Sequence, residues 1–65
     1  MKIELKESYS DWTATEYDIF GDNGKWGDAS VVINKSGVWF RTGRSHSNFS
    51  ADELEAVSKA MRELI

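Results

Sequence analysis

Cysteine and proline are both missing from this chain of 65 residues, and histidine occurs only once. Without cysteine the chain can form neither a disulfide nor a thiolate metal site, and one histidine cannot make an imidazole cluster. We therefore expect no metal and no cofactor. A domain this short that lacks such cross-links must rely on dense packing or on association with a partner for its stability.

Runs of more than three apolar residues are absent as well. The first residues alternate polar and apolar, without the apolar stretch of a signal peptide, and no segment is long enough to span a membrane. We expect a cytoplasmic protein that forms a single domain, residues 1–65. Its net charge of −3 argues against bulk binding of nucleic acid.

The helix that can be predicted most clearly occupies the last sixteen residues. Ser50 is a favourable N-cap, Glu53 completes a capping box with it, and Phe49 can pack on Leu54 across the cap. We therefore expect a helix that begins at Ala51. Its apolar stripe follows helical spacing and consists of Leu54, Val57, Met61 and Leu64.

Four segments that precede this helix have the composition or alternation of strands. They are Lys2–Lys6, Trp12–Phe20, Ala29–Asn34 and Val38–Thr42. The segment 21–24 predicts a hairpin turn with Asn23-Gly24 at its corner, and residues 7–11 suit another turn. The predicted fold class is α+β, a four-stranded antiparallel meander with one C-terminal helix packed on one face. The meander is the default order for short connections, and the sequence leaves other strand orders open.

The hairpin between the last two strands determines which residues share a face. We predict a three-residue loop, residues 35–37, with Gly37 in a left-handed conformation. The resulting pairs are Asn34 with Val38, Ile33 with Trp39 and Val32 with Phe40. The face with Val32, Val38 and Phe40 is the more apolar, so we assign the helix to it. The far face then carries Val31, Ile33, Trp39 and Arg41.

A helix about 10 Å wide covers only part of a sheet face about 15–20 Å wide. The sequence therefore predicts a small non-catalytic protein-binding module, whose partner is another protein or a second copy in a dimer. The predicted partner-binding residues are Trp39, Arg41, Arg44, Ile33 and Val31. Size and acidity also suit a phage or mobile-element accessory protein that inhibits a host factor. An internal explanation stays open, in which the loop with Trp26 or the segment 9–12, which contains Trp12, covers Trp39.

The alternative function is binding of single-stranded nucleic acid. Residues 29–51 contain no acidic residue, and an aromatic and basic sheet face can stack bases and follow the backbone. The candidate residues are Lys35, Trp39, Arg41, Arg44 and His46. An enzyme is not predicted, because His46 has no cysteine partner and its serine neighbours are adjacent in sequence, where productive alignment is rare.

Overall fold

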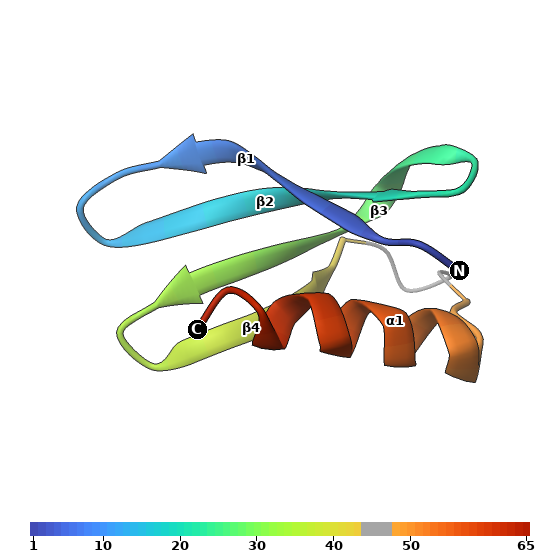
Figure 1. Ribbon diagram of the computed structural model, residues 1–65. Helices are drawn as coiled ribbons and strands as arrows, with labels where there is room; N and C mark the ends of the chain where they lie inside the picture. The colour runs from blue at the N-terminus through green and yellow to red at the C-terminus, as the bar shows by residue number, and fades with distance from the viewer. Residues whose placement is uncertain (44–47) are drawn as a thin grey trace.

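The computed structural model describes residues 1–43 and 48–65. Four antiparallel strands form one open sheet in the order β1-β2-β3-β4, followed by one C-terminal helix (Figure 1). The strands are β1 Glu4–Ser10, β2 Ala14–Gly21, β3 Gly24–Asn34 and β4 Gly37–Thr42, and the helix is α1 Ala51–Arg62. The predicted α+β meander is confirmed. Among the described residues no helix has the length and apolarity needed to cross a membrane.

The first hairpin turns later than predicted. β1 continues through residues 7–10, with a bulge between Glu7 and Tyr9, and the turn lies at residues 11–13. The Asp11 carboxylate fixes this turn, because its Oδ1 accepts hydrogen bonds from the backbone N–H of Thr13 at 2.8 Å and of Ala14 at 2.9 Å. Trp12 therefore lies in a turn and not in a strand.

The second hairpin has Asp22-Asn23 at its corner, one residue before the predicted pair, because Gly21 pairs with Gly24. Gly24 has a φ of 104°, a conformation that side-chain-bearing residues rarely adopt. β3 therefore begins earlier than predicted, and its pairing with β2 is irregular between Asp18 and Phe20. Trp26 lies in this irregular part of β3.

The register of the third hairpin differs from the prediction by one residue. Asn34 pairs with Gly37, so the loop has two residues, and the next pairs are Ile33–Val38, Val32–Trp39 and Val31–Phe40. The Asn34 side chain accepts a hydrogen bond from the Ser36 backbone N–H at 2.8 Å, which stabilises the tight turn. Hydrophobic pattern could not have fixed this register, because both strands are apolar at adjacent positions.

The core lies between the sheet and α1 and consists of Ile19, Ala29, Val31 and Val57. The predicted capping box of Ser50 and Glu53 is present at the start of the helix. The ring of Phe49 stacks on Trp26 and meets Phe40 edge-on, with both centroid distances 5.4 Å. Leu54 was predicted on the buried stripe but is 44% exposed, because the helix turns Ala56 and Ala60 inward beside Val57.

Candidate functional site

The sheet face opposite α1, which we call the outer face, carries a row of four side chains across all four strands. Cross-strand partners share a face, and the pairings place Tyr9, Glu16, Val32 and Trp39 in one such row. The neighbouring row consists of Lys6, Asp18, Ser30 and Arg41. The outer face is thus mixed, with aromatic rings on its two edge strands and charged side chains on β1, β2 and β4.

Two ion pairs join basic and acidic side chains of the outer face. The Arg41 guanidinium lies 3.7 Å from the Glu16 carboxylate, and the Lys25 ammonium lies 3.5 Å from Asp18. The Lys6 ammonium lies 4.8 Å from the centre of the Phe20 ring, where a cation is attracted to the aromatic face. Exposed pairs of this kind add about 0–1 kcal/mol each to stability. Their larger effect is to leave this face without an excess of positive charge.

Two rings at the ends of the first row are exposed and held by hydrogen bonds. Trp39 is 53% exposed, and its Nε1–H donates to Asn34 Oδ1 at 3.3 Å. Tyr9 is 61% exposed, and its hydroxyl donates to Asp11 Oδ2 at 3.1 Å. An amphipathic ring that is already oriented loses less entropy when a partner covers it. Neither Trp12 nor Trp26 covers Trp39, since Trp12 is 92% exposed and Trp26 packs beside the core.

Among the described residues two groups have shifted pKa values, and they lie close together: Asp11 in the first turn and Tyr9 near the end of β1. Hydrogen bonds from the Thr13 hydroxyl, then from the Thr13 and Ala14 backbone N–H groups, lower the pKa of Asp11 to about 2. The hydrogen bond to Asp11 and the negative charge of that carboxylate raise the pKa of Tyr9 above its usual value. Asp11 therefore keeps its charge, and its hold on the turn, in mildly acidic solution.

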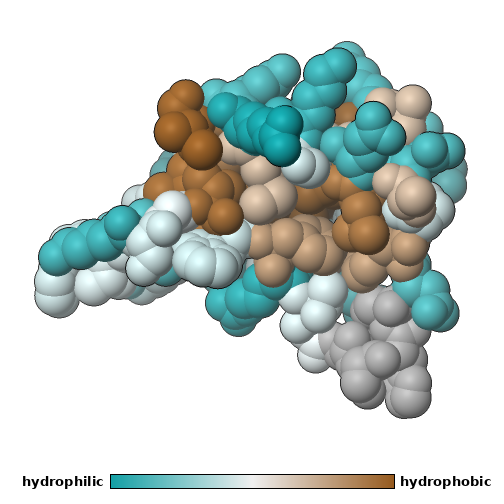
Figure 2. Space-filling view, turned by 90° about the horizontal axis from the view of Figure 1, so that it is seen from below, coloured by the Kyte–Doolittle hydropathy of each residue, from teal (hydrophilic) through white to brown (hydrophobic). Residues whose placement is uncertain are grey.

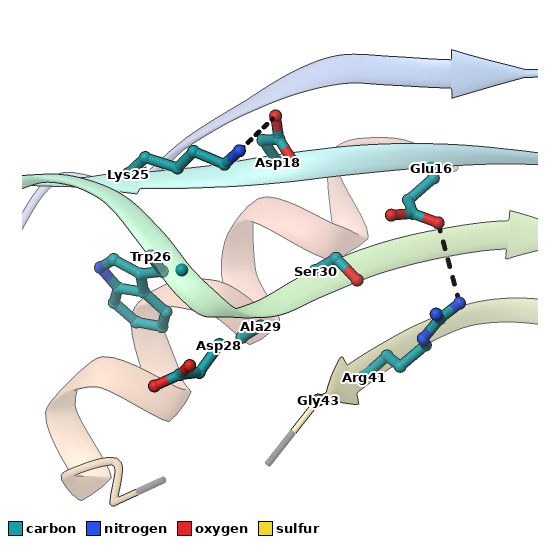
Figure 3. Close-up of a pocket in the computed structure, with 10 residues that line it drawn as sticks. Glu16, Asp18, Lys25, Trp26, Asp28, Ala29, Ser30, Arg41 and Gly43 are labelled. Carbon is teal, nitrogen blue, oxygen red and sulfur yellow. Dashed lines mark ion pairs between the residues drawn. The ribbon is translucent and has the colours of Figure 1, made fainter.

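A shallow polar hollow of about 170 Å³ lies beside the ion pairs. Figure 3 shows the Trp26 indole toward one end and the Glu16–Arg41 pair toward the other, with Ser30 between them on β3. The hollow arises where β3 departs from regular pairing with β2. It is open and lined by charged and hydroxyl groups, so it suits a polar side chain of a partner and not an apolar ligand.

The structure separates the predicted partner-binding residues. Trp39 and Arg41 lie on the outer face as expected. The prediction that Val31 and Ile33 share that face is wrong, because the one-residue difference in register turns both toward α1 and leaves Val31 fully buried. Arg44 lies outside the described residues.

The nucleic-acid candidates are also dispersed. Lys35 is exposed in the hairpin loop at one end of the sheet, and His46, like Arg44, lies outside the described residues. Sequence reasoning missed Tyr9 and Val32 as outer-face residues. Tyr9 was assigned to a turn, and the correct hairpin register was the signal that would have placed Val32 beside Trp39.

The described residues contain no group of three or more histidine, cysteine, aspartate or glutamate side chains placed to hold a metal ion. Comparisons with protein-family models, with curated proteins and with solved structures found no match.

Proposed function

We propose that this protein is a non-catalytic module that binds a protein partner through the outer face of its sheet. The observation that carries the proposal is the row from Tyr9 to Trp39, in which two oriented, half-exposed rings flank Glu16 and Val32. The helix lies on the opposite face and leaves this row open. Trp, Tyr and Arg are the residues that dominate binding energy at protein interfaces.

The chemistry of the row favours a mixed, mainly uncharged partner surface. Covering a large ring contributes about 1.5–3 kcal/mol before the costs of association. The ion pairs Arg41–Glu16 and Lys25–Asp18 already neutralise their own charges, so a strongly charged partner gains little from them. The polar hollow beside these pairs adds a place where one hydrogen-bonding side chain of the partner can fit.

Single-stranded nucleic acid is the second candidate, because bases can stack on Tyr9 and Trp39. The balanced charges of the outer face and the net charge of −3 support it less well. A titration with oligonucleotides at low and at high salt separates the two functions. Phosphate contacts strengthen as salt falls, so tryptophan fluorescence that responds only at low salt would favour nucleic acid.

The protein-binding proposal is tested with a Tyr9→Ala, Trp39→Ala double variant. We expect the immobilised wild type to capture a specific protein from an extract of the source cells, and the double variant to lose at least about tenfold of that affinity with the purified partner. The matched control is Trp12→Ala, which removes a still more exposed ring outside the row.

Circular dichroism of all three proteins excludes unfolding as the cause of a loss. The proposal is contradicted if the double variant binds the partner as well as the wild type does. It is also contradicted if Trp12→Ala loses as much affinity as the double variant, since binding would then not depend on the row.

A further inference from the structure

The outer edge of β4 carries backbone groups that can pair with another strand. β4 is the last strand of the sheet, and the Gly43 N–H donates to the Asp28 carbonyl on β3 at 2.8 Å. In an antiparallel pair the inward and outward directions alternate along the strand. The backbone N–H and C=O groups of Val38, Phe40 and Thr42 therefore point outward, away from β3.

The opposite edge, β1, is protected against pairing in ways that β4 is not. β1 carries Glu4, Lys6 and Glu7, has a bulge after Glu7, and directs Glu7 toward the helix side, where it pairs with Tyr17. Charged residues, bulges and inward charges are the usual devices that prevent edge-to-edge pairing. β4 pairs with β3 without a register shift and contains neither lysine nor proline; its one charged residue is Arg41, whose side chain lies on the outer face.

Apolar side chains accompany this open edge. A hollow of about 210 Å³ between β4 and α1 is lined by Val38, Ser58, Met61, Arg62 and Ile65. Leu54, one turn before Ser58, is 44% exposed, and Ile65 is 91% exposed. Figure 2 looks at this side from below and shows hydrophobic side chains gathered in a band between hydrophilic ones. We use the name β4 flank for the outer edge of β4 together with six side chains: Val38, Leu54, Ser58, Met61, Arg62 and Ile65.

We propose that the β4 flank binds a second copy of this chain, β4 against β4 in antiparallel orientation about a two-fold axis at Phe40. With this axis, Phe40 pairs with Phe40 of the second copy, and Val38 pairs with Thr42 of the second copy. The outward backbone groups of all three residues in each strand are then hydrogen-bonded. Roughly six backbone hydrogen bonds form. The two sheets then join into one sheet of eight strands.

Side chains on both faces fit this arrangement. On the outer face Trp39 lies opposite Arg41 of the second copy, where the guanidinium can stack on the indole. On the inner face the two helices run antiparallel, and the small Ser58, which lines the hollow beside Val38, permits their close approach. Glu55 and Arg62 precede and follow Ser58 by three and four residues, so each Glu55 faces Arg62 of the second copy. The same surface is thus complementary to itself, as a two-fold interface requires.

The proposed dimer rests on a sheet edge and a helix side, and it shares only Trp39 with the row that carries the proposed partner binding. We expect sedimentation equilibrium to show dimers that dissociate on dilution. Amide hydrogen exchange measured at high and low protein concentration should show extra protection at high concentration for Val38, Phe40 and Thr42. The β1 edge should show no such change. A chain that stays monomeric at millimolar concentration would overturn the inference.

Thr42→Pro removes one outward N–H without removing a bond to β3, and proline is tolerated at strand edges. We expect it to weaken the dimer at least about tenfold, since a lost interstrand bond leaves its partner group unsatisfied. Thr42→Ala keeps the N–H and is the matched control. Equal dimerisation of the proline and alanine variants would contradict β4 pairing.

A charge exchange tests the helix contact and does not depend on how proline affects folding. Glu55→Arg places like charges together across the axis and should weaken the dimer about five-fold. The double variant Glu55→Arg, Arg62→Glu should restore it, because the pair is re-formed only between two antiparallel copies. If Glu55→Arg does not weaken the dimer, or if the double variant does not restore it, Glu55 and Arg62 do not face each other across the interface, and the proposed helix contact is wrong. Tyr9→Ala should leave dimerisation unchanged, so failure of this inference and failure of the proposed function are distinguishable.

Discussion

The two faces of the sheet are best compared through two identical residues, one on each face. Val31 and Val32 are neighbours on β3, yet Val31 is fully buried against the helix side while Val32 lies in the outer row beside Trp39. On the inner face apolar groups pack on Val57 and Phe49, and on the outer face ion pairs separate exposed rings. Between these two valines residue type is the same, so the position of α1 decides which side chain supports the fold and which is available for binding.

The largest expected effect comes from replacing, in separate variants, one valine on each face of the sheet by alanine. Val31→Ala should lower the free energy of unfolding by about 2–3 kcal/mol, because it removes two buried methyl groups and leaves a cavity. Val32→Ala makes the same chemical change on the outer face and should cost less than about 1 kcal/mol. Urea unfolding followed by tryptophan fluorescence measures both.

Equal destabilisation by the two variants would show that both faces are buried to the same degree in solution. A larger effect of Val32→Ala would show that the register of the β3–β4 hairpin is the one predicted from sequence, in which Val32 faces the helix.

The next effect concerns the inner face where β2 meets the irregular part of β3. A Cβ placed on Gly21 would lie 2.6 Å from Nε1 of Trp26, so Gly21→Ala must displace the indole that stacks on Phe49. We expect a loss of about 1–3 kcal/mol in unfolding free energy. Gly27→Ala is the matched control, since its added methyl group meets no atom within 4 Å.

Gly27 also lacks a positive φ, so its replacement should be close to neutral or slightly stabilising. If Gly21→Ala is as well tolerated as Gly27→Ala, the indole of Trp26 does not pack over Gly21, and the inner face is loosely packed at this end.

The smallest effect is expected at Asp11, beside the outer face, because its carboxylate is exposed to solvent. Its pKa falls from 3.8 to about 2 on folding, so the ionised form is favoured in the folded state. The resulting stabilisation is fully present above pH 4 and is lost as the pH falls toward 2. Asp11→Asn cannot titrate, so its thermal midpoint should decline less between pH 4 and pH 2 than that of the wild type.

Thr13→Ala sharpens this test, because it removes the hydroxyl that contributes most to lowering the pKa of Asp11. That variant should lose its stabilisation at a higher pH than the wild type. Identical acid profiles for wild type and Asp11→Asn would show that the carboxylate does not hold the turn.

Local signals predicted much of the fold. The capping box at Ser50 and Glu53 and the glycine-rich turn at residues 21–24 act within a few residues, so sequence spacing was enough to find them. The first turn was misplaced, because Asp11 forms it through three hydrogen bonds that composition does not distinguish from an extended serine-rich segment. The outer-face positions of Trp39 and Arg41 were predicted correctly, while Tyr9 and Val32 were missed.

Periodicity, turn chemistry and capping were enough to predict four strands and one amphipathic helix, with the meander as the default strand order for short connections. Which valine of β3 faces the helix, and which edge strand is open, depend on contacts between distant parts of the chain. In strands that are apolar on both sides, a shift of one residue reverses every side chain at little local cost. The register is set by the two-residue loop that Asn34 stabilises and by the stacking of Trp26 on Phe49, which packs the sheet against the helix.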